Sequence, residues 1–217
     1  MREFHSFALS RSGHYAVLNW LAQQFDGCIF ESHPPRRDKV IWNEVKDTTT
    51  HRQYVRIIGY DDMRLGTARA YIMQGKEVIV MARDPYNLWA SLRYMGKRLD
   101  LDLWKEYAGL LCQQFKGWGM TFNGWFCDEG YRERVLRGMR IQVRDLANHR
   151  MSGASAFSGY LNRNCPGGLG VMSRWAQYVG EKGVHGDFKV LCNDVMVQRY
   201  CLEMFGWAVN GDLEVIS

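Results

Sequence analysis

The chain is poor in the features that mark several large protein classes. It has six cysteines among 217 residues, and no two of them form a C-x-x-C pair, so a zinc site is not expected. No apolar stretch reaches the roughly 20 residues that a membrane span needs. Residues 1–9 carry no secretory signal pattern. These absences predict a cytoplasmic protein that holds no metal and binds no membrane.

The charge of the chain is modestly positive and evenly spread. Lys and Arg number 28 against 23 Asp and Glu, which gives a formal net charge of +5. Such a balance suits an anionic ligand. There is no polybasic run and no basic motif interleaved with aromatic residues, so a nucleic-acid partner is not expected. The length and the 47% hydrophobic composition predict one packed domain over residues 1–217.

Apolar runs alternate with helical periodicity through the first half of the chain. We predict strands at residues 3–9, 27–30, 54–60 and 77–82, and helices at residues 15–25, 63–74 and 85–97. In the second half we predict helices at residues 101–115, 131–137 and 195–205, and a strand at residues 140–143. Strands that alternate with helices are typical of a parallel sheet. We therefore expect an α/β fold with a central parallel sheet flanked by helices, resembling the P-loop nucleotide-binding architecture.

Two turn sequences follow predicted strands directly. The letters SRSGHY at residues 10–15 follow the first strand, and RDP at residues 83–85 follows the fourth, with Ser91 eight residues beyond Arg83. In a parallel sheet both turns lie at the carboxyl ends of strands, where ligands bind. A helix start there points backbone N–H groups and a dipole at an anion. Two such sites suit the two ends of a doubly phosphorylated nucleotide.

The first turn departs from the Walker A pattern. Gly13 matches its second glycine, but Ala8 replaces the first. His14 stands in place of the lysine, and Tyr15 in place of the hydroxyl that helps to hold magnesium. These departures count against a nucleoside or nucleotide kinase, which stays open as one with a degenerate phosphate loop. A non-catalytic binder of nucleotides or RNA is the other alternative, and it predicts salt-sensitive nucleic-acid affinity without turnover.

Taken together, the two turns resemble those of sulfotransferases that use 3′-phosphoadenosine-5′-phosphosulfate (PAPS). The resemblance rests on Arg11-Ser12-Gly13 in the first turn, and on Arg83 and Ser91 at the family's spacing. It implies that the first turn holds the 5′-phosphosulfate and the second holds the 3′-phosphate. The residues implied to contact the cofactor are Arg11, Ser12, Gly13, His14, Tyr15, Arg83 and Ser91. The implied reaction moves a sulfuryl group to an acceptor hydroxyl or amine and leaves 3′,5′-adenosine bisphosphate.

A third segment, KGVHGDFK at residues 182–189, is similar to the RKGxxGDWK segment of cytosolic sulfotransferases. The resemblance implies that Lys182 and Gly183 also contact the 3′-phosphate. Glu181 stands where the family has arginine, so one contact of the family is missing. The acceptor would be a small molecule or a glycan. Residues 33–50 and 152–170 are expected to form its walls, because substrate class is set in such loops.

The reaction needs a base to take the proton of the acceptor. Glu31 stands twenty residues after Arg11, where some sulfotransferases have a catalytic glutamate. Asp61 and Asp62 follow the third strand, where cytosolic members have a histidine. We rank Glu31 first, then Asp61, then Asp62. Either aspartate could instead cap a helix that begins at Met63. His14 could donate to, or place a charge on, the transferring group.

Overall fold

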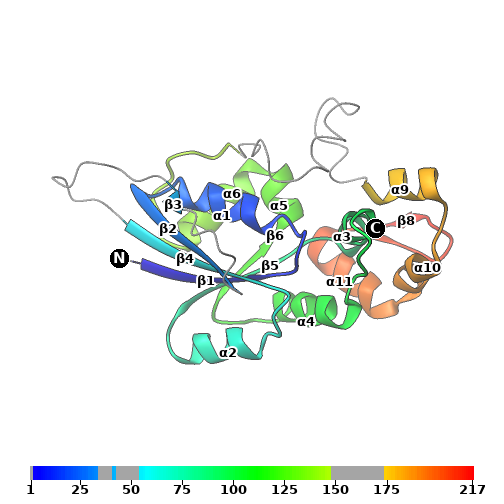
Figure 1. The fold of residues 1–217 in the computed structure, drawn as a ribbon, viewed down its shortest axis with the longest axis horizontal. Helices are drawn as coiled ribbons and strands as arrows, with labels where there is room; N and C mark the ends of the chain where they lie inside the picture. Colours follow the sequence, from blue (N-terminus) through cyan, green and yellow to red (C-terminus); the bar gives the residue numbers. More distant parts are fainter. Residues whose placement is uncertain (1, 34–40, 43–53, 148–173) are drawn as a thin grey trace. The chain divides into compact units, whose positions relative to one another are not determined.

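The computed structural model describes residues 2–33, 41–42, 54–147 and 174–217 (Figure 1). They belong to two compact units. Unit 1 draws on Met1–Ala82 and Gln114–Arg150, and unit 2 on Arg83–Gln113 and Met151–Ser217. Of the two expected acceptor walls, 152–170 lies outside the described residues, and 33–50 is described only at residues 33 and 41–42.

Unit 1 is built on a sheet of six strands in the order β3-β2-β4-β1-β5-β6. Five of them pair in parallel, and the short β3 runs antiparallel to β2 at the edge. This confirms the α/β class with a central parallel sheet. The strands are β1 (Arg2–Ala8), β2 (Gly27–His33), β3 (Ile41–Trp42), β4 (Tyr54–Asp61), β5 (Glu77–Ala82) and β6 (Trp118–Thr121).

Helices flank both faces of this sheet (Figure 1). The side chains of β1 alternate between the two faces, as strand geometry requires. Phe4 contacts the ring of Phe25, which follows α1, whereas His5 and Phe7 contact Tyr71 of α2. The helices of unit 1 are α1 (His14–Ala22), α2 (Gly66–Met73), α5 (Phe122–Cys127) and α6 (Glu129–Gly138). We call the two sides the α1 face and the α2 face.

The helix predicted from residue 63 begins later, at Gly66. Asp62 has a φ of 57°, in the left-handed region that a right-handed helix cannot include. The residue that precedes α2 is Leu65, and no side chain caps this helix. The prediction that Asp61 or Asp62 caps a helix is therefore wrong, and both side chains are engaged elsewhere.

The strand predicted at residues 140–143 is also wrong. Arg140 has a φ of 55° and ends α6, where its N–H donates to the carbonyl of Arg137. Further along this segment, the N–H groups of Arg144 and Asp145 donate to the side-chain oxygen of Gln24, at 3.0 and 3.2 Å. The side chain of Gln24 thus binds two backbone N–H groups that would otherwise need a partner from a neighbouring strand. The strand that pairs with β5 is β6, which the sequence analysis did not predict.

Unit 2 is helical, with one small hairpin. Three of its helices begin at aspartates whose carboxylates accept backbone N–H groups, namely Asp84, Asp100 and Asp194. Its elements are α3 (Pro85–Tyr94), α4 (Leu101–Cys112), α9 (Arg174–Lys182), α10 (Gly186–Asn193), α11 (Val195–Phe205), β7 (Ala208–Val209) and β8 (Val215–Ile216). As predicted, α11 spans residues 195–205 and is stopped by Gly206, which has a φ of 75°. No helix in the described ranges is both long and apolar enough to span a bilayer.

Candidate functional site

Strands β1 and β4 end side by side at the carboxyl edge of the sheet of unit 1. These strands are neighbours, with Ala8 in register with Asp61. The chain leaves β1 toward α1 on one face and leaves β4 toward α2 on the other. Loops that diverge in this way from adjacent parallel strands leave a ligand crevice at the carboxyl edge of a sheet. The first predicted anion turn, which we call the anion loop (residues 9–13), lies at this point.

The backbone of the anion loop turns sharply into α1. Arg11 and Gly13 have φ values of 70° and 87°, and the N–H of Ser12 donates to the carbonyl of Leu9 at 3.1 Å. Gly13 is the residue before α1, so the first N–H groups of the helix follow it directly. Residues that alternate in backbone handedness form concave arrangements of N–H groups that bind anions. The local geometry is therefore suited to a phosphate or sulfate group.

Gly13 is required for a reason that the sequence does not reveal. A Cβ atom at this position would overlap the ring of Phe122, the first residue of α5. The ring packs against Trp125 and Phe126, which lie on the same helix. Gly13 therefore lies directly against the ring of Phe122. The position of Phe122 after an unpredicted strand kept it out of the sequence-based site.

Ser12 supplies a buried hydroxyl at the centre of the loop. Its side chain is 0% exposed, and its Oγ has no hydrogen-bond partner among the described residues. Buried polar atoms are nearly always paired, so an unpaired one in the anion loop needs an explanation. An anionic oxygen bound in the loop would supply the missing partner. The contact between Ser12 and a phosphosulfate stays a prediction.

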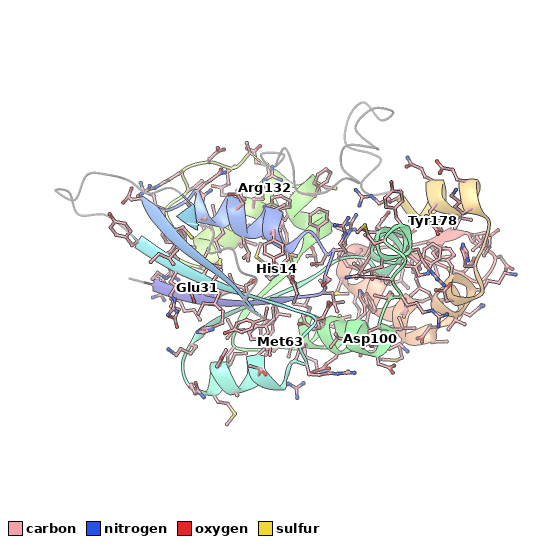
Figure 2. The ribbon with its side chains drawn as sticks, viewed as in Figure 1. His14, Glu31, Met63, Asp100, Arg132 and Tyr178 are labelled. Carbon is pink, nitrogen blue, oxygen red and sulfur yellow. The ribbon has the colours of Figure 1, made fainter. Side chains whose placement is uncertain are left out.

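His14 and Tyr15 turn toward the sheet and share one carboxylate. His14, the first residue of α1 (Figure 2), is 2% exposed. Its Nδ1 lies 3.0 Å from Asp61 Oδ1, and its Nε2 lies 2.8 Å from the hydroxyl of Ser6 on β1. The Tyr15 hydroxyl donates to Asp61 Oδ2 at 3.0 Å. The structure therefore brings His14, Tyr15 and Asp61 together, and it adds Ser6, which sequence reasoning missed.

Asp62 holds the other end of the anion loop. Its Oδ1 accepts the backbone N–H of Ser10 at 2.8 Å, and its Oδ2 accepts the Ser10 hydroxyl. The N–H of Asp62 also donates to the carbonyl of Ala8 at 3.0 Å. Consecutive aspartates at the end of β4 thus bind the loop at its start and at its exit. Asp62 has a positive φ, so the backbone turns between Asp61 and Asp62. The carboxylate of Asp61 binds His14, whereas that of Asp62 binds Ser10.

Glu31 lies apart from this group. It is in register with Ile58 of β4, three residues before Asp61, which is about 10 Å along a strand. Its carboxylate accepts from the guanidinium of Arg56 at 2.8 Å, and the same guanidinium donates to Glu3 at 2.9 Å. These two ion pairs raise the pKa of Arg56. Glu31 is therefore part of a charged network on the α2 face.

The remaining predicted contacts belong to unit 2. Arg83 is buried, and its carbonyl accepts the indole N–H of Trp104 at 2.9 Å. Asp84 caps α3 by accepting the N–H of Asn87 at 2.8 Å. Ser91, two turns along α3, is buried as well. Unit 2 therefore places Arg83 at the start of the helix that carries Ser91.

Lys182 and Gly183 lie at the end of α9 and are exposed. Gly183 has a φ of 77°, and its N–H donates to the carbonyl of Val179, so it ends the helix as glycine often does. Asp187, in the first turn of α10, accepts the indole N–H of Trp89 at 3.2 Å and forms an ion pair with Arg93. Both partners lie on α3. The third motif is thus anchored to the helix that carries Ser91.

No group of three or more His, Cys, Asp or Glu residues in the described ranges could hold a metal ion. The chain matches no protein-family model and no curated protein sequence. Its fold is similar to the crystal structure of mouse sulfotransferase SULT7A1 complexed with PAP. That match has a TM-score of 0.43 and 12% sequence identity, and it covers 91% of this chain and 81% of that one.

Proposed function

We propose that the chain transfers a sulfuryl group from PAPS to an acceptor hydroxyl or amine. The observation that carries the proposal is the anion loop, with its unpaired buried Ser12 hydroxyl, followed by His14 and Tyr15 bound to Asp61. A kinase would use these two positions for a lysine that contacts phosphate and a hydroxyl that contacts magnesium. Here the side chains of His14 and Tyr15 both bind the carboxylate of Asp61. This favours a transfer reaction that needs neither the lysine–phosphate contact nor the hydroxyl–magnesium contact of a kinase.

The assignment of residues follows the two units. In unit 1, Arg11 offers a guanidinium, and Ser12 and Gly13 offer a hydroxyl and backbone N–H groups to the 5′-phosphosulfate. The resemblance in sequence assigns the 3′-phosphate to four residues of unit 2: Arg83, Ser91, Lys182 and Gly183. When bound, PAPS supplies the sulfuryl group. The residues of the chain orient it and stabilise negative charge on its oxygens.

We assign the acceptor proton to the carboxylate of Asp61. This side chain is 14% exposed and lies at the carboxyl edge of the sheet, beside the end of β1. Its bonds from His14 and Tyr15 hold it in one orientation. Glu31 is the second candidate, and its pairing with Arg56 would have to break before it could act. This reverses the ranking that the sequence alone suggests.

Calorimetric titration with 3′,5′-adenosine bisphosphate, beside ATP with magnesium, tests the proposal. We expect tight binding of the bisphosphate, lost in Arg11→Ala and kept in Arg98→Ala, which removes an exposed arginine elsewhere. An acceptor screen with PAPS would then follow. Preference for magnesium-ATP would support the kinase instead. Salt-sensitive binding of RNA without turnover would support the non-catalytic alternative.

A further inference from the structure

We propose that His14 is a switchable cation beneath the anion loop, and that its protonated form raises the affinity of this loop for a dianion. The inference rests on the proposed function for the identity of the natural ligand, a group that ends in a sulfuryl or phosphoryl anion. His14 does not touch the ligand in this scheme. It acts on the loop through its charge and through its two hydrogen bonds.

The proton on Nδ1 follows from the partners of Asp61. An ionised carboxylate only accepts hydrogen bonds. Asp61 Oδ1 lies 3.0 Å from Nδ1, and Oδ2 accepts from the Tyr15 hydroxyl. Nδ1 is therefore the donor in the pair with Asp61. This assignment comes from the network of partners and not from observed hydrogens.

The other ring nitrogen can accept or donate without any movement. Nε2 lies 2.8 Å from the hydroxyl of Ser6, a residue that is 0% exposed. A serine hydroxyl can donate to a bare ring nitrogen or accept from a protonated one by rotating its hydrogen. His14 can thus gain a proton and keep both of its hydrogen-bond partners. Most buried groups lose a partner when their charge changes, and that loss opposes titration.

The charges around the loop explain why the proton matters. Ser6 on β1, Asp61 on β4 and Tyr15 on α1 face the imidazole directly. Asp62 binds Ser10 at the start of the loop, and Arg11 is a residue of the loop itself. When His14 is neutral, the carboxylates of Asp61 and Asp62 place negative charge beside a site for an anion. A proton on His14 offsets part of that charge, and the effect is increased because the side chains of His14 and Asp61 are 2% and 14% exposed.

Inorganic sulfate is the probe, because it stays a dianion between about pH 5.5 and pH 8, where phosphate esters titrate. Its affinity can be measured by NMR titration of the ¹⁵N-labelled protein. We expect sulfate to bind about tenfold more tightly at the lower pH, the size of one added charge-assisted interaction. His14→Gln keeps a side chain that can donate and accept, and it should bind sulfate without this pH dependence.

His5→Gln is the matched control. His5 lies on the same strand as Ser6 but on the α2 face, and its own pKa is lowered by burial. Its replacement should leave the pH dependence of sulfate binding unchanged. A second measurement needs no variant, since ¹⁵N shifts of the imidazole report the charge of His14 directly. Sulfate should increase the protonated fraction of His14 at a fixed pH, because coupling between the two ligands, proton and sulfate, is reciprocal.

Three results would overturn the inference. They are sulfate binding with an unchanged pH dependence in His14→Gln, a protonated fraction of His14 that sulfate does not change, and an absence of sulfate binding at either pH. The function is tested separately with the bisphosphate. A His14-dependent sulfate effect without bisphosphate binding would reject the sulfotransferase and keep the switch. Bisphosphate binding with no role for His14 would do the reverse.

Discussion

Glu31 and Asp61 point to opposite faces of one sheet. Glu31 is in register with Ile58 on β4, and Asp61 follows three residues later. An odd spacing along a strand reverses the direction of a side chain. Asp61 therefore shares the α1 face with His14 and Ser6, whereas Glu31 shares the α2 face with Arg56. A group bound in the anion loop can be served by only one of these carboxylates at hydrogen-bond distance.

We expect Asp61→Asn to lower turnover by about a hundredfold or more, the usual contribution of a positioned base. Glu31→Gln should leave turnover within a few-fold of the parent. The measurement is kcat with a fixed acceptor and saturating PAPS, beside the affinity for the bisphosphate. If Glu31→Gln instead abolishes turnover while affinity holds, the base is Glu31.

The hydroxyls of Ser12 and Ser6 predict opposite outcomes for the same substitution. Ser12→Ala removes an unpaired hydroxyl, so the free protein should be as stable as the parent or more so. Ser6→Ala removes the partner of His14 and should lower the free energy of unfolding by about 1–2 kcal/mol. Urea denaturation checks both. Added bisphosphate should stabilise Ser12→Ala less than the parent, and equal stabilisation would remove Ser12 from the site.

Alanine substitutions at Gly13 and Gly75 distinguish the cost of backbone strain from the cost of steric overlap. Both have positive φ, but only Gly13 has a neighbour, Phe122, in the space that a Cβ would fill. Gly75→Ala should cost about 1–2 kcal/mol, the penalty for a left-handed residue. Gly13→Ala should cost at least about 1 kcal/mol more, because the ring must shift. Denaturation curves for both variants, for Phe122→Ala and for Gly13→Ala with Phe122→Ala test this. In the Phe122→Ala background, Gly13→Ala should cost no more than Gly75→Ala does in the parent, because the overlap is gone.

Burial lowers the pKa of His5 below the ordinary value of 6.5. The unfolded chain then binds more protons than the folded one as the pH falls below about 6.5, so stability should decrease there. We expect the free energy of unfolding of His5→Gln to depend less on pH between about pH 5 and pH 7. Parallel pH-stability curves for the parent and the variant give the comparison. Identical slopes would show that His5 does not contribute.

Helices and strands whose limits are marked by neighbouring residues could be predicted from the sequence. The strand at residues 77–82 and the helix at 195–205 match the structure because an apolar run and a closing glycine mark their limits. The strand β6 was not predicted, since it is four residues long and includes Gly119. The prediction of a strand at residues 140–143 was wrong, and a side chain, Gln24, binds the segment that follows them. Side chains that arrive from distant segments leave no periodic signal.

The candidate site divides in the same way. The turn at residues 10–15 could be predicted from the sequence because its glycine and serine lie next to each other in the chain. The pairing of His14 with Ser6 and Asp61 could not be predicted, because it depends on the face of the sheet to which each side chain points. Register decides that, and register is a property of the whole sheet.

The contacts of Asp61 and Asp62 have a consequence for local unfolding of residues 10–15. Because Asp62 holds Ser10 while Asp61 holds His14 and Tyr15, residues 10–15 cannot detach without breaking contacts to β4. Surface loops usually open on their own, far below the cost of global unfolding. Here opening is coupled to the edge of the sheet. Amide hydrogens of this turn should therefore exchange with solvent at rates close to those of β1, as one cooperative unit with the strand that precedes it.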